Sequence, residues 1–229
     1  MSDGALNDQL INRLAHRINL DRLADICGVD IIVAGGALLA DKPHDYDVYA
    51  ASCHAPLDFT HLQDKLEAMG GWRRICSTRN AMTVEGPDGN IYQFCTYTKD
   101  DPDSLIRSFD FAHCQVGVVV KASAKHPKEA HFTEEFIRAM ALQQTFFTGS
   151  DYPLASLARL VKYAQRGWYG KGRGYLPDIL AILRDVVRRG YQDYDDFKDQ
   201  LDAIDLSYSD NGSYDLWLAV RDRLCSKEG

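Results

Sequence analysis

The segment from residue 31 to residue 49 constrains the fold of this chain more than any other part of the sequence. It begins with the apolar run Ile31-Ile-Val-Ala34, continues with Gly35-Gly36, and returns as Asp45-Tyr46-Asp47-Val48. A short apolar run that ends in glycine is typical of a buried strand. The later stretch alternates polar and apolar residues, as a strand with one buried face does. The segment therefore predicts two successive strands joined by a glycine-containing connection.

The two aspartates are expected on one face of the second strand. Side chains alternate along a strand, so Asp45 and Asp47 point the same way, about 6.5–7 Å apart along the chain. Two carboxylates at this spacing can share or flank divalent ions, and hard oxygen ligands suit Mg²⁺. Nucleotidyl transfer needs mainly charge neutralisation, which two metal ions about 3.5–4 Å apart supply. We therefore expect Asp45 and Asp47 to be catalytic and to bind two Mg²⁺ ions.

The glycine pair has a place in the same chemistry. Residues without a β-carbon let backbone N–H groups approach phosphate oxygens closely at the start of a helix. Gly35 and Gly36 are therefore expected to bind the triphosphate of a nucleotide. The structural alternative is an ordinary hairpin, because a single glycine pair and a single Asp-x-Asp each occur commonly in turns.

This pattern resembles the head of the DNA polymerase β-like nucleotidyltransferase superfamily. The signature of that superfamily is Gly-Gly or Gly-Ser, a short spacer, and then acidic-hydrophobic-acidic-hydrophobic residues on the next strand, here Gly35-Gly36 and Asp45-Tyr46-Asp47-Val48. The resemblance implies an α+β fold: a nucleotidyltransferase-type mixed β-sheet head with flanking helices, followed by an α-helical lobe. It also implies an enzyme that binds an NTP such as ATP, transfers its nucleoside monophosphate to an acceptor hydroxyl, and releases pyrophosphate.

A third acidic residue is expected from the resemblance, because members carry one on a neighbouring strand. Asp110 is the candidate, and in this role it would be a catalytic residue and a metal ligand. Asp110 also lies in Arg107-Ser-Phe-Asp-Phe, which is similar to the Arg-Arg-Asp-Phe motif of tRNA CCA-adding enzymes and could instead contact the nucleotide sugar. The structural alternative is a helix N-cap or turn residue. Several relatives have an acidic residue where this chain has Gln93. A metal site with only two carboxylates is therefore the alternative to a site completed by Asp110.

A basic segment between residues 151 and 178 is a second candidate binding surface, because it contains no acidic residue. Arg159, Lys162 and Arg166 are spaced i, i+3, i+7, which places them on one face of a predicted helix that could bind the nucleotide. Aromatic residues are interleaved and could stack on bases. The segment is similar to the Arg-rich helix of CCA-adding enzymes, which implies RNA as a partner. The alternative is a solvated basic face with aromatics in the core.

Hydrophobic periodicity predicts a catalytic head over residues 1–125 and a helical domain over residues 126–229. In the head, one leading helix is expected over 6–27 and another helix at 56–69, and strands are expected at 30–34, 45–49, 72–76, 81–85, 91–97 and 114–121. In the second half, helices are expected at 133–144, 153–165, 175–189, 194–204 and 213–225. The polar stretch 121–129 is the expected linker.

Composition excludes several classes of protein. The chain has 229 residues, of which 45% are hydrophobic, enough for a sizeable core. No apolar run is long enough to span a membrane and no signal peptide is recognisable, so we expect a cytoplasmic protein without a membrane partner. Six cysteines without a Cys-x-x-Cys pair indicate reduced core residues rather than a zinc site.

Three functional classes follow. The first is the Mg²⁺-dependent nucleotidyltransferase, with an RNA 3′ end, a protein or a small molecule as acceptor. The second is a catalytically silent nucleotide-binding or interaction module, which Gln93 in place of an acid would suit. The third is a structural protein in which the Asp-x-Asp is fortuitous.

Overall fold

The structure is a computed structural model that describes residues 3–78, 80–123, 125–169 and 174–202. The chain divides into two compact units. The first, which we call the sheet unit, contains residues 1–109 and 113–137, and the second, the helical unit, contains residues 110–112 and 138–229. The predicted domain boundary after residue 125 stays a prediction, although the sheet continues past this point.

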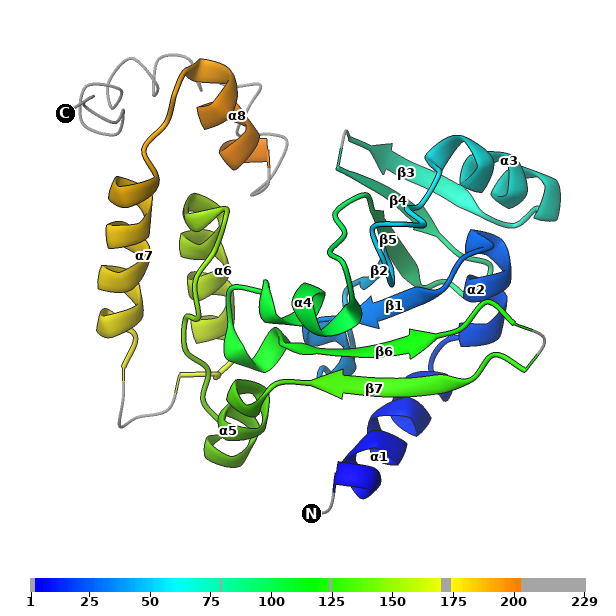
Figure 1. Ribbon diagram of the computed structural model, residues 1–229, viewed down its shortest axis with the longest axis horizontal. Coiled ribbons are helices and arrows are strands. Elements are labelled where there is room, and N and C mark those ends of the chain that lie inside the picture. The colour runs from blue at the N-terminus through cyan, green and yellow to red at the C-terminus, as the bar shows by residue number, and fades with distance from the viewer. Residues whose placement is uncertain (1–2, 79, 124, 170–173, 203–229) are drawn as a thin grey trace. The chain divides into compact units, whose positions relative to one another are not determined.

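The sheet unit is built on a mixed sheet of seven strands in the order β3-β4-β5-β2-β1-β6-β7 (Figure 1). The pair β2–β5 is parallel, and the other neighbours are antiparallel. The strands are β1 (Ile31–Ala34), β2 (Tyr46–Ala50), β3 (Arg73–Ser77), β4 (Ala81–Glu85), β5 (Ile91–Cys95), β6 (Val116–Val120) and β7 (Lys128–Phe132). This architecture confirms the predicted α+β class.

Helices cover both faces of this sheet. Alternation along β1 sends Ile31 and Val33 into one core and Ile32 into the other. The first core is closed by α1, α2 and α3, and the second by α4, whose Leu105 and Ile106 pack on Ile32. The bounds are α1 (Asp3–Ala15), α2 (Leu20–Cys27), α3 (Phe59–Met69), α4 (Pro102–Arg107) and α5 (Glu134–Leu142), with two 3₁₀ helices, η1 (Gly36–Leu38) and η2 (Ala112–Cys114).

The helical unit contains α6 (Pro153–Gln165), α7 (Leu176–Arg189) and α8 (Tyr194–Asp202). Helices α6 and α7 lie side by side, as Figure 1 shows. These bounds agree closely with the helices predicted at 153–165, 175–189 and 194–204. The helix predicted at 213–225 lies outside the described residues. No helix in the described ranges is long and apolar enough to cross a membrane.

Three elements of the sheet unit differ from the sequence-based expectation. The leading helix is two helices, because the Asn19 side chain accepts a hydrogen bond from the Arg22 N–H and caps the start of α2. Strand β7 lies in the stretch 128–132, where the sequence shows no apolar alternation. It forms by pairing with β6, and Asn7 of α1 accepts a hydrogen bond from its Ala130 N–H. Helix α4, capped by Asp101, was also not expected.

Candidate functional site

Strand β2 positions the two aspartates. Asp47 is paired with Ala34 of β1 on one side and with Gln93 of β5 on the other. Its neighbours Tyr46 and Val48 are buried in the first core, so Asp47 faces the opposite side of the sheet. Asp45 comes two residues earlier, just before the strand begins, and both aspartates are half-buried.

Cys95 is buried near the two aspartates. It lies in β5, paired with Tyr49 of β2. Burial raises the pKa of the Cys95 thiol well above its usual range, and the negative charges of Asp47 and Asp45 raise this pKa further. Both carboxylates therefore lie within electrostatic reach of one thiol, which stays protonated and neutral at physiological pH.

The donor set here is suited to a hard cation. Gln93 lies beside Asp47 in the sheet, and its side-chain N–H donates to the Thr83 hydroxyl at 3.5 Å. Within the described ranges, no group of three or more His, Cys, Asp or Glu side chains is arranged to hold a metal ion. The carboxylates of Asp45 and Asp47 are charged oxygen donors of the kind that suits Mg²⁺ held by few protein groups and several waters, and binding of Mg²⁺ by them stays a prediction.

The glycine turn lies directly against Asp47. Gly35 has φ 89° and ψ −164°, a conformation that only glycine adopts easily. A β-carbon added to Gly35 would lie 3.6 Å from a carboxylate oxygen of Asp47. The Gly35 N–H donates to the Val116 carbonyl at 2.9 Å, so this amide is used by the sheet. Gly35 thus shapes the turn, and η1 starts immediately afterwards at Gly36.

Two arginines that the sequence analysis did not identify hold the end of this turn: Arg13 in α1 and Arg17, two residues after it. Arg13 donates to the Leu39 carbonyl at 2.7 Å and to the Asp41 carboxylate at 2.9 Å. Arg17 donates to the Ala40 carbonyl at 2.5 Å. Cations at the carbonyl end of a helical turn are favourable. Their contacts are 23 to 28 residues away in sequence, and the helical spacing of α1 gives no signal for them.

We predict that Gly35→Ala is more damaging than Gly36→Ala. A side chain at Gly35 is strained by the positive φ, which costs about 1–3 kcal/mol of the free energy of unfolding. Gly36 lies outside the left-handed region, and a β-carbon there would meet the Cys114 sulfur at an ordinary 3.7 Å. Urea unfolding of both variants measures the difference. Equal losses would contradict a conformational role that is specific to Gly35.

Asp110 belongs to the helical unit and is only 6% exposed. Its Oδ2 accepts a hydrogen bond from the Ser156 hydroxyl and forms a salt bridge with the Arg159 guanidinium, both at 2.7 Å. Its backbone carbonyl accepts from the Thr148 N–H at 2.9 Å. These contacts connect the 110–112 segment to α6. The role of Asp110 as a catalytic residue and third metal ligand stays a prediction.

The two basic residues of α6 and the basic residue that caps its end differ in their surroundings. The Arg159 side chain is 39% exposed and points its guanidinium at Asp110. Lys162, in the last turn, and Arg166, the C-cap, are exposed. The predicted common face is therefore occupied at one end by a salt bridge within the unit. Nucleotide binding by these residues stays a prediction.

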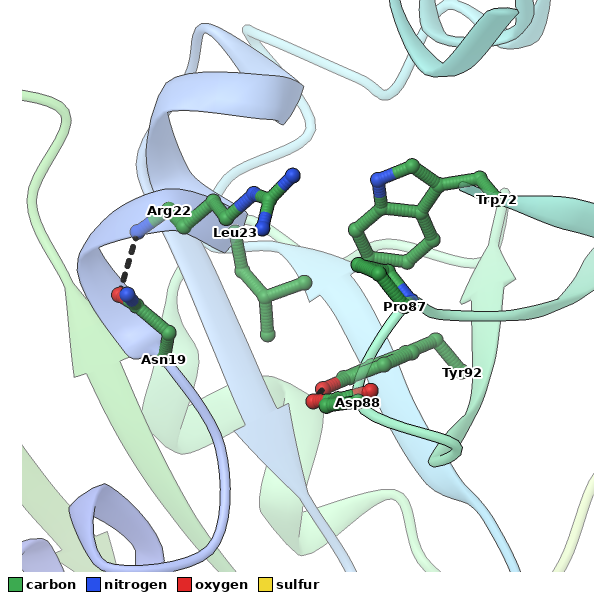
Figure 2. Close-up of a pocket in the computed structure, with 7 residues that line it drawn as sticks. All are labelled: Asn19, Arg22, Leu23, Trp72, Pro87, Asp88 and Tyr92. Carbon is green, nitrogen blue, oxygen red and sulfur yellow. Dashed lines mark hydrogen bonds between the residues drawn. The ribbon is translucent and has the colours of Figure 1, made fainter. Parts of the chain in front are cut away.

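A pocket of about 230 Å³ opens elsewhere on the sheet unit (Figure 2). In Figure 2, Arg22 and Trp72 face each other across it, with Tyr92 and Asp88 at one end. Tyr92 alternates with Gln93 along β5, so this pocket lies on the opposite face of the sheet from Asp47. We do not assign the nucleotide to this pocket, because Asp45, Asp47 and the glycine turn are not part of its lining.

Family membership follows from the sequence over the sheet unit. Residues 6–143 match the family described as Gabija anti-defense 2 family protein, which is more than half of the 229 residues. The chain belongs to the Gabija anti-defense 2 family. The matched region includes the glycine turn, Asp45 and Asp47 of this family member. No curated protein matches the chain.

Solved structures of CCA-adding enzymes share the fold. The CCA-adding enzyme of Thermotoga maritima, complexed with tRNA, is 14% identical, with a TM-score of 0.52 over 93% of this chain and 54% of that one. A CCA-adding enzyme complexed with CTP is also 14% identical, with a TM-score of 0.51 over 93% and 54% of the two chains. The chain thus spans about half the length of these structures. The likeness confirms the predicted nucleotidyltransferase-like fold.

Proposed function

We propose that this member of the Gabija anti-defense 2 family is a metal-dependent nucleotidyltransferase. It would transfer a nucleoside monophosphate from an NTP to an acceptor hydroxyl and release pyrophosphate. One observation carries the proposal: the Gly35 turn lies against Asp47, which follows Asp45 by two residues, in a sheet that has the fold of CCA-adding enzymes. A glycine turn beside paired carboxylates can hold a triphosphate and its cations together.

Each residue has a distinct role in this proposal. Asp45 and Asp47 would hold two Mg²⁺ ions, which when bound neutralise the triphosphate and lower the pKa of the attacking hydroxyl. Gly35 gives the turn its shape, and the backbone from Gly36 onward approaches the phosphates. Arg13 and Arg17 keep this turn in place, which orients the phosphates for in-line displacement.

An RNA 3′ end is the acceptor that we propose first. The solved structures with this fold include a CCA-adding enzyme with tRNA and another with CTP. The exposed Lys162 and Arg166 would contribute phosphate contacts, which depend on charge rather than on base sequence. A protein or small-molecule hydroxyl is the alternative acceptor for the same chemistry.

A second candidate function is a catalytically silent nucleotide-binding or interaction module. Gln93 favours it, because this residue lies beside Asp47 at a place where an acid would add a third charged ligand. A silent module would keep its binding function without either carboxylate, whereas the enzyme needs both for catalysis.

The test is incubation of the purified protein with each α-labelled NTP, Mg²⁺ and total RNA, with label in RNA and free pyrophosphate as the two readouts. Labelled RNA would support the RNA nucleotidyltransferase and identify its nucleotide. Pyrophosphate release with label in another acceptor would support the enzyme but not the RNA. An absence of turnover with every NTP, RNA, protein and small-molecule acceptor supplied would favour the silent module.

A further inference from the structure

The pocket of the sheet unit in Figure 2 lies between the start of α2 and the turn that joins β4 to β5. We call it the α2 pocket. The Asn19 side chain caps α2 and so fixes Arg22 in the first turn of this helix. Gly86 lets the β4–β5 turn come close, because a β-carbon there would lie 2.8 Å from the Tyr92 ring and 3.1 Å from the Trp72 ring. The lining of the pocket is therefore held in place from both sides.

Two hydrogen-bond donors face this pocket without an acceptor. The Trp72 Nε1–H is buried and has no hydrogen-bond partner in the part of the chain that the structure describes. Arg22 is half-buried, and its guanidinium forms no salt bridge or hydrogen bond with the described residues; its Cζ lies 5.9 Å from the centre of the Trp72 ring. In Figure 2 the indole nitrogen and the guanidinium point toward each other across the gap. Since a buried donor without an acceptor is costly, an acceptor group on a ligand would be stabilised by both donors.

The charges of the lining favour a ligand with one negative group. Asp88 lies at one end of the pocket, where its carboxylate accepts hydrogen bonds from the Tyr92 hydroxyl and the Asn90 N–H. This carboxylate would repel a second anionic group, whereas Arg22 attracts the first. A triphosphate, with several negative charges, is therefore a poor fit. A carboxylate fits well, because its two oxygens match the planar donors of a guanidinium.

The rest of the lining is suited to an apolar group. Leu23, Pro87 and the rings of Trp72 and Tyr92 supply apolar surface. The two ring centres are 5.4 Å apart and the ring planes are tilted by 53°, so an aromatic ring can pack on one of them face to face or edge to face. At about 230 Å³ the pocket is smaller than the roughly 300–1,000 Å³ of pockets that hold drug-sized ligands, which indicates a smaller molecule.

We propose that the α2 pocket binds a small monocarboxylate with an apolar body about the size of one ring. The carboxylate would accept hydrogen bonds from the Arg22 guanidinium and the Trp72 Nε1–H, and the body would pack on the apolar part of the lining. The pocket lies on the opposite face of the sheet from Asp47, so this ligand would be separate from the nucleotide. The inference does not depend on the proposed enzymatic function.

Nuclear magnetic resonance of the ¹⁵N-labelled full-length protein tests the inference. The three tryptophans give three indole N–H signals, and the signal that is lost in Trp72→Phe identifies Trp72. Phenylacetate should move this signal downfield in a saturable manner, with a dissociation constant on the order of 1 mM, because the proton gains a charged acceptor. Acetate, which lacks the ring, and benzyl alcohol, which lacks the charge, should bind at least tenfold more weakly.

Arg22→Gln should weaken phenylacetate binding at least tenfold, because glutamine is uncharged and lacks the planar guanidinium donors. Arg74→Gln is the matched control: Arg74 is exposed on β3, donates to the Gln63 side chain and is not part of the lining, so this variant should bind normally. Trp72→Phe is a second variant, which keeps an aromatic ring and removes the donor. Saturation-transfer measurements on the ligand should show about tenfold weaker binding to it. Unchanged backbone amide signals away from the pocket would show that each variant is folded.

Three results would overturn the proposal. The first is the absence of a saturable shift of the Trp72 signal with phenylacetate. The second is equal binding of acetate or benzyl alcohol, or equal binding by Arg22→Gln. The third is a shift with the peptide Gly-Gly-Phe but not with phenylacetate, which would make the pocket a site for a protein C-terminus. Asp47→Asn should bind phenylacetate normally, so this test and the test of nucleotidyl transfer succeed or fail separately.

Discussion

Replacement of Asp45 or Asp47 by asparagine should reduce nucleotidyl transfer at least about 1000-fold and leave the fold intact. Bound metal ions contribute several kcal/mol of transition-state charge stabilisation, and a neutral amide cannot replace a carboxylate in holding them. Stability should change by less than about 1 kcal/mol, because both residues are half-buried and asparagine has nearly the same size and shape as aspartate. Rates of pyrophosphate release and urea unfolding measure the two effects.

Asp64→Asn is the matched control for these variants. Asp64 is exposed on α3, whose Leu62 and Leu66 pack in the first core, on the other side of the sheet from Asp47. Its activity should equal that of the unmodified protein. Titration with Mn²⁺ followed by electron paramagnetic resonance adds a readout that needs no acceptor: the Asp45 and Asp47 variants should bind Mn²⁺ at least tenfold more weakly. Full turnover in either variant would exclude the proposed mechanism.

Arg159→Ala should destabilise the helical unit by about 2–3 kcal/mol. The substitution removes the salt bridge to a carboxylate that is only 6% exposed, and the Ser156 hydroxyl remains as the other side-chain donor to Asp110 Oδ2. A buried charge that loses its partner costs more than the salt bridge itself contributes. Chemical unfolding, followed by a probe in the helical unit, measures the loss.

Lys162→Ala supplies the comparison on the same helix. Lys162 is exposed, so its removal should change stability by no more than about 0.5 kcal/mol. If Arg159 mainly contacts the nucleotide, Arg159→Ala would instead weaken NTP binding and leave stability close to that of Lys162→Ala. That pattern would contradict the structural role and support the predicted nucleotide-binding role.

Local patterns in the sequence were enough to predict most secondary structure. Helices α6 and α7 have regular apolar spacing, and the half-buried residues of β4 alternate with buried ones. These elements were predictable because burial of one face requires apolar residues at the period of the element. Strand β7 was not predictable, because Lys128–Phe132 lacks this alternation and acquires its conformation from backbone pairing with β6.

The sequence by itself determined that a glycine turn precedes a strand that carries Asp47, with Asp45 two residues earlier, because both follow from short-range backbone geometry. Only the tertiary structure decided that this turn touches Asp47, since the contact depends on the pairing of β1 with β2. It alone also revealed the Arg13 and Arg17 contacts with the turn, and the burial of Asp110 against Arg159, 49 residues away. Such contacts arise from packing between distant segments, to which periodicity and local spacing are insensitive.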